Sequence, residues 1–214
     1  MKKALIMSLC AVLLVTATVL GTLAFLTAQD TVVNTFTVGQ VSIELDEAKV
    51  KPDGTLDGDE RVKTNDYHLV PGMTYIKDPT MTVEAKSEEA YVRMLLVINC
   101  ASQFDEIFSP EKADLTKIFN GYDAETWVYV STSRDTVKNT VTYEFRYKET
   151  VATSDQDTVL PALFKSLTVP GNFDGEDMAA LADLEITVIG NAIQAASFDN
   201  ADDAWTAFND QINK

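Results

Sequence analysis

Residues 139–148, NTVTYEFRYK, alternate between apolar and polar side chains more regularly than any other stretch of the chain. The apolar positions are Val141, Tyr143, Phe145 and Tyr147. Because successive side chains of a strand point to opposite faces, this pattern predicts a strand with one buried face. An aromatic stripe could also form a platform for a ligand such as a sugar ring, but it is more often a core face, and we interpret it so.

Stretches on both sides repeat the β pattern. We expect strands over 35–46, 80–85, 90–100, 126–132 and 184–193, with 90–100 at the centre of a sheet because it is apolar on both faces from Met94 to Ile98. Roughly seven or eight short strands separated by turn signals predict an all-β fold with a few short helices, namely a jelly-roll-like β-sandwich with a C-terminal helix.

Between the strands, helical spacing predicts helices over 103–120, 175–183 and 199–212, the first broken by Pro110. The last begins at Asp199 or Asn200 as its cap and has Trp205 and Phe208 on its apolar face. Residues 51–63 (KPDGTLDGDERVK) are predicted to be a polar loop with two Asp-Gly turns, and 161–169 fit no single element.

The N-terminus has the features of an export signal. Lys2 and Lys3 precede an uncharged run over 4–26, and Thr22-Leu23-Ala24 places small residues where a signal peptidase reads them. We therefore predict a signal peptide over 1–24, cut between Ala24 and Phe25, and a single domain over 25–214. The alternative is a membrane-anchored surface domain, since 23 uncharged residues can span a bilayer. Gly21, a helix breaker just before the cut site, favours cleavage.

The chain is strongly acidic, with 17 Lys and Arg against 33 Asp and Glu and a formal charge of −16. Cleavage would remove two lysines and change the charge to −18. Such a surface argues against nucleic-acid binding and against docking on anionic lipid, which both need basic faces. Of the two cysteines, Cys10 would leave with the signal peptide, so no intrachain disulfide is expected and Cys100 is predicted to be a buried, inert thiol.

Three stretches resemble the TasA/camelysin family of exported proteins of Gram-positive bacteria. They are GTLAFLTAQDTVVNTFTVGQVSIELDE (21–47), YHLVPGMTYIKDPTMTVEAKSEEAYVRMLLVIN (67–99) and AIQAASFDNADDAWTAF (192–208). The resemblance implies a jelly roll, a dedicated (SipW-type) signal peptidase, and a structural role in the fibres of the extracellular biofilm matrix. The implied partners are further copies of the chain or related matrix subunits, with contact to the membrane only through an uncleaved N-terminus. Phe25-Leu26 stands where the family commonly has Tyr-Phe, which could shift the cut site by a residue or two.

In such fibres each subunit lends an N-terminal strand to its neighbour, and residues 25–33 (FLTAQDTVV) are the candidate donor strand. The apolar members are Phe25, Leu26, Val32 and Val33, and the segment has no Pro and no Gly. An extended segment without a partner can pair with an open sheet edge on another molecule, and such head-to-tail contacts make filaments. The alternative is that the segment folds back as the first strand of its own sheet.

Catalytic and metal sites find little support. A zinc peptidase of the camelysin type needs more than the single His68, and the chain has no HExxH motif, so we expect no enzyme activity. Calcium is the one cofactor considered. Its weak candidate ligands are the carboxylates of Asp53, Asp57, Asp59 and Glu60 and those of Asp174, Glu176 and Asp177, but neither cluster has the spacing of a twelve-residue calcium loop.

Overall fold

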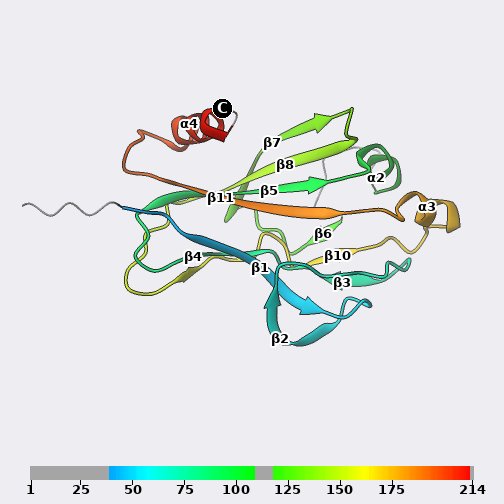
Figure 1. Cartoon of the computed structure of the whole chain (residues 1–214). Helices are drawn as coiled ribbons and strands as arrows, with labels where there is room; N and C mark the ends of the chain where they lie inside the picture. The colour runs from blue at the N-terminus through cyan, green and yellow to red at the C-terminus, as the bar shows by residue number, and fades with distance from the viewer. Residues whose placement is uncertain (1–38, 109–117, 213–214) are drawn as a thin grey trace, which may run out of the picture. The chain divides into compact units, whose positions relative to one another are not determined.

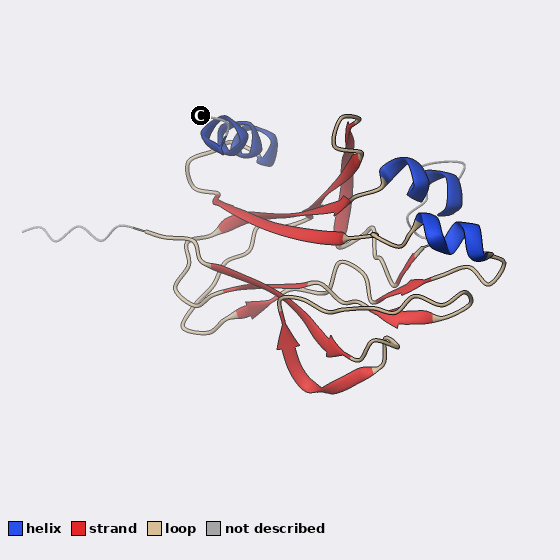
Figure 2. Cartoon of the chain, turned by 45° about the vertical axis from the view of Figure 1, so that its right-hand side comes forward, coloured by secondary structure: helices blue, strands red, loops and turns tan. Residues whose placement is uncertain are grey.

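The computed structural model describes residues 39–108 and 118–212. These residues form antiparallel sheets stacked in two facing layers, with three short helices outside them (Figures 1 and 2). The all-β class and the C-terminal helix are therefore confirmed, whereas the jelly-roll connectivity stays a prediction.

The first layer is a four-stranded sheet in the order β11-β5-β8-β7. Its strands are β11 (Ile186–Gln194), β5 (Ala90–Ile98), β8 (Thr140–Tyr147) and β7 (Trp127–Asp135). The alternating side chains of β8 face the core as predicted, with Val141, Tyr143 and Phe145 buried. The prediction that β5 is central is also correct, because it pairs with β11 on one side and β8 on the other.

The second layer contains two smaller sheets, in the orders β2-β1-β4-β9 and β3-β10-β6. Their strands are β1 (Ile43–Val50), β2 (Leu56–Val62), β3 (Thr74–Ile76), β4 (Thr80–Val83), β6 (Phe119–Asn120), β9 (Thr158–Val159) and β10 (Ser166–Thr168). Met81 and Val83 of β4 meet Met94 and Leu96 of β5 in one buried apolar cluster between the layers.

Helices lie outside the core. Both α2 (Ala101–Phe108) and α3 (Gly175–Ala180) lie at one end of the layers, and α4 (Ala201–Ile212) lies on the outer face of the first layer (Figure 2). Asn200 caps α4, since its side-chain oxygen accepts the Asp203 N–H at 3.0 Å. The buried guanidinium of Arg93 lies over the Trp205 ring at 4.4 Å and donates to Asn209 at 2.8 Å, which fastens α4 to the sheet.

Three predicted elements need correction. The strand expected over 35–46 is β1, which begins at Ile43 and runs on to Val50, while 39–42 are not strand and 35–38 lie outside the described residues. Its limits follow from its partners, because β4 pairs with the first half and β2 with the second. The ambiguous stretch 161–169 contains β10.

The loop expected over 51–63 is a turn followed by strand β2. Asp53-Gly54 does make the turn, with Gly54 at φ +79°, where an added Cβ would lie 2.5 Å from the Tyr75 ring. Asp57-Gly58 instead lies inside β2. The side chains of this strand are almost all exposed, so it has no apolar alternation for the sequence to reveal.

The helix expected over 103–120 is shorter, because α2 ends at Phe108. Residues 109–117, Pro110 among them, lie outside the described part of the chain. Phe119 belongs to β6 and pairs with Leu167 of β10, so its burial is that of a strand residue rather than of a helix face.

Candidate functional site

The residues predicted to take part in cleavage and strand donation precede the described part of the chain. Ala24 and Phe25 at the cut site, and Leu26, Val32 and Val33 of the donor strand, fall within residues 1–38. Both predictions therefore stay predictions, and the structure bears on them through the surfaces that could receive a donated strand.

The first calcium candidates are already engaged with protein groups. The Asp53 carboxylate accepts the Thr55 N–H at 3.0 Å and the Thr55 hydroxyl at 2.6 Å, and these bonds lower the pKa of Asp53. Glu60 lies 2.9 Å from the Lys49 ammonium and Asp57 lies 3.8 Å from it. Asp59 is exposed on β2.

The second calcium candidates form a helix cap. The Asp174 carboxylate accepts the N–H groups of Glu176 and Asp177 at the start of α3. Within residues 39–108 and 118–212, no group of three or more His, Cys, Asp and Glu side chains is placed to hold a metal ion. The calcium hypothesis stays a prediction.

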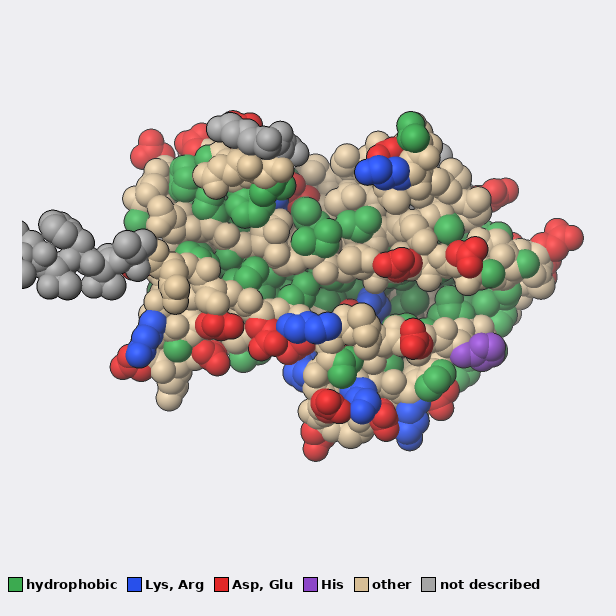
Figure 3. Space-filling model, viewed as in Figure 1, with side chains coloured by type: hydrophobic (Ala, Val, Ile, Leu, Met, Phe, Trp, Pro, Cys, Tyr) green, Lys and Arg blue, Asp and Glu red, His purple; other side chains and the backbone are tan. Residues whose placement is uncertain are grey.

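His68 lies at the rim of a cavity of about 520 Å³ (Figure 3, purple). The walls come from the 65–69 loop, from β3, β10 and α3, and from the beginning of β11. The imidazole is exposed, and it is the His68 carbonyl that is bound, accepting the Tyr75 hydroxyl at 2.8 Å. Cys100, expected to be buried, is half-buried at φ +50°.

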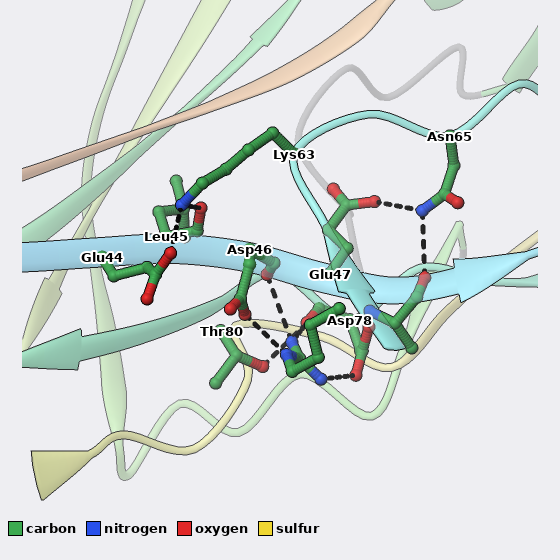
Figure 4. Close-up of polar contacts among 10 residues, drawn as sticks. Glu44, Leu45, Asp46, Glu47, Lys63, Asn65, Asp78 and Thr80 are labelled. Atoms are coloured by element: carbon green, nitrogen blue, oxygen red, sulfur yellow. Dashed lines mark hydrogen bonds and ion pairs between the residues drawn. The ribbon is translucent and has the colours of Figure 1, made fainter. Parts of the chain in front are cut away.

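A buried ion pair lies beside this cavity, and one partner, Lys77, lines it. The Lys77 ammonium lies 2.6 Å from a Glu47 carboxylate oxygen, and both side chains are about nine-tenths buried. Asn65 supports the loop beside them by donating to the Ala48 carbonyl at 3.0 Å (Figure 4). Each partner neutralises a charge that is largely removed from water, and the pair joins β1 to the segment after β3.

We expect Glu47→Gln to lower the free energy of unfolding by about 1–3 kcal/mol, because the buried Lys77 ammonium loses its counter-charge while the shape is kept. Urea unfolding of the variant measures the change. The matched control is Glu60→Gln, which removes the exposed partner of Lys49 and should cost less than about 1 kcal/mol. Equal losses in the two variants would contradict the assignment of a buried pair.

The phenol of Tyr67 lies beside the same pair. Burial raises the pKa of Tyr67, and the nearby carboxylates of Glu47 and Asp78 raise it further. The folded protein therefore keeps the phenol proton of Tyr67 at a pH where the unfolded chain has released it. The contribution of this group to the free energy of unfolding is present in full below pH 10 and is lost as the pH rises above that value. We expect part of the tyrosine absorbance change at 295 nm to appear only with unfolding, and Tyr67→Phe to reduce that part. Burial also raises the pKa of Tyr122 and Tyr143, so these two tyrosines should keep the remainder.

Charged side chains screen the backbone of β1. Lys63 bonds both the Glu44 carboxylate and the Leu45 carbonyl, each at 2.9 Å, as Figure 4 shows. Arg61 bridges the carboxylates of Asp46 and Asp78. Strand β1 lies between β2 and β4 in its sheet, so these charges stand beside an inner strand.

The two outer strands of the first layer each pair with one neighbour among the described residues, and they differ in how exposed their side chains are. Strand β11 lies close to the second layer at Gly190, where an added Cβ would come within 2.6 Å of Met81 and 3.6 Å of Leu45. Strand β7 pairs with β8 and, among the described residues, with no other strand. Its side chains are exposed over most of its nine residues.

The sequence identified 126–132 as a strand but did not reveal that it lies at an edge. Three successive apolar residues, Val128, Tyr129 and Val130, are 41%, 47% and 40% exposed. No charged residue occurs from Trp127 to Ser133. The sequence shows that this stretch carries no charge, but it does not show that β7 has a paired strand on one side only.

No family model, no curated protein and no solved structure matches this chain. None of the helices in the described residues is long and apolar enough to cross a membrane.

Proposed function

We propose that this chain is an exported structural protein of the extracellular matrix, a fibre subunit or an accessory to fibres, that assembles by donating its N-terminal strand after cleavage. The observation that supports the proposal best is an antiparallel β-sandwich in which the outer strand β7 has, within residues 39–108 and 118–212, a paired strand on one side only. Such an edge presents a row of backbone N–H and C=O groups that an extended segment can bind.

The sequence supplies the matching segment. Residues 25–33 are predicted to become the new N-terminus, and they contain one charged residue, no Pro and no Gly. A donated strand joins unlike surfaces of two copies, so each added copy offers a fresh site and the assembly grows as a filament.

Electron microscopy of the purified chain beginning at Phe25 tests the proposal, with the uncut chain as its control. We expect fibres from the first and none from the second. A cut chain that remains monomeric at high concentration would contradict fibre assembly.

The proposal includes the absence of enzyme activity. Zinc analysis and a casein-cleavage assay, each with a His68→Ala control, test this part. Casein cleavage that a chelator abolishes and His68→Ala removes would instead favour a secreted metallopeptidase.

A further inference from the structure

We propose that the free edge of β7 is the surface that receives residues 25–33 of a second copy. This inference rests on the proposed function, and it selects one acceptor among the sheet edges that the described residues offer.

The other edges are less suitable for physical reasons. Strand β2 contains Asp57, Asp59, Glu60 and Arg61, and it faces solvent with these charges. Strands β3, β6 and β9 have only two or three residues each. The middle of β11 lies against Met81 and Leu45 of the second layer. Strands β7 and β11 are the two long edges, and neither has a charge over 127–133 or 186–194. We select β7 because three successive apolar residues, Val128, Tyr129 and Val130, are exposed on it, whereas most side chains of β11 are half-buried.

The side of β7 that faces the core is incompletely covered. Tyr129 pairs with Phe145, whose own side chain is buried, and the two rings meet edge to face with centroids 5.9 Å apart. Tyr129 nevertheless remains 47% exposed. An apolar strand laid along β7 would bury part of this ring together with Val128 or Val130, and burial of apolar area drives association.

Charge favours residues 25–33 as the occupant. Two copies of the chain that begins at Phe25, each with a formal charge of −18, repel each other over most of their surfaces. The stretch from Trp127 to Ser133 has no charge, and residues 25–33 contain only Asp30. These two surfaces can therefore approach each other with little electrostatic repulsion.

A bulge in β7 argues against the symmetric alternative, in which two β7 edges pair with each other. The register with β8 shifts between Tyr129 and Ser131, so the strand is bent at Val130. If two β7 edges paired with each other, the bulge of each strand would have to fit against the other strand. A single extended segment can instead pair on one side of the bulge.

Disulfide cross-linking between separately substituted copies tests the acceptor. In the chain beginning at Phe25 with Cys100→Ser, copies with Val32→Cys are mixed with copies bearing Val128→Cys or Val130→Cys. The matched control partner is Ile189→Cys on β11, since Ile189 is 44% exposed and Val128 is 41% exposed. We expect intermolecular disulfides with the β7 positions at least tenfold above those with Ile189→Cys.

Other results would overturn the inference in distinguishable ways. Fibres that cross-link at Ile189→Cys, or at neither edge, would exclude β7 as the acceptor but leave strand donation intact. Val128→Cys copies that form disulfides mainly with each other would indicate edge-to-edge pairing. If the unsubstituted chain makes no fibres, the proposed function itself fails, and this inference with it.

A charge placed on the edge provides a second test. Val128→Lys should raise the protein concentration needed for fibres at least tenfold, because the ammonium would have to be buried under the added strand. The control is Val137→Lys in the turn between β7 and β8, where the side chain is 94% exposed. Equal assembly of the two folded variants would contradict the proposal.

Discussion

A chain that begins at Asn34, and therefore lacks residues 25–33, should form no fibres and remain a folded monomer. The reason is that the deleted segment is the proposed donor, while the described sheets begin at β1, with Ile43. Electron microscopy and analytical ultracentrifugation measure assembly, and circular dichroism reports whether the β structure is kept. Fibres equal in mass to those of the chain beginning at Phe25 would refute strand donation.

Single substitutions at Val32 test whether assembly depends on the apolar side chains of residues 25–33 and not only on the presence of the segment. Val32→Asp should weaken assembly, because an added strand would bury a carboxylate that has no partner. Val32→Thr has nearly the same shape and no charge, so it should assemble much better than Val32→Asp. If both variants make the same fibre mass at the same protein concentration, Val32 is not buried in the contact.

Trp127→Ala should lower the free energy of unfolding by about 3–5 kcal/mol, the loss typical of removing a large buried aromatic side chain. Trp127 is fully buried at the start of β7. Its ring meets the Tyr147 ring edge to face, with centroids 5.2 Å apart, and its indole N–H donates to the Pro161 carbonyl at 2.9 Å. Urea unfolding measures the loss. A change below about 1 kcal/mol would show that this end of the core is not packed as described.

The second tryptophan supplies a matched control for the hydrogen bond. Trp205 is also buried, but its indole nitrogen has no hydrogen-bond partner among the described residues. Trp127→Phe leaves the Pro161 carbonyl without its donor and should cost about 1 kcal/mol more than Trp205→Phe. Equal costs would mean that the indole bond of Trp127 contributes nothing measurable.

Strands with one buried face could be recognised from the sequence. In β8 the alternation of Val141, Tyr143 and Phe145 with polar residues is a local property with a period of two. In β5 the apolar run on both faces indicated a central position, and the structure confirms it. The helix α4 was evident from Asn200 and from the apolar spacing of Trp205 and Phe208.

Strand β2 and the pair Lys77–Glu47 could not be recognised in this way. The side chains of β2 stay in solvent, so what makes it a strand is its pairing with β1 rather than any apolar pattern of its own. Lys77 and Glu47 are 30 residues apart, and each alone looks like an ordinary surface charge. Their burial follows from the way two separate segments pack.

The sequence by itself determined where most strands lie, that the chain is acidic, and that residues 25–33 contain four large apolar side chains and one charged residue. Only the tertiary structure decided which strands lie at the edges, and so that the uncharged residues of β7 face outward without a second partner among the described residues. The physical reason is that alternation depends on near neighbours along the chain. Edge position depends on pairing between distant segments, as between β5 and β11.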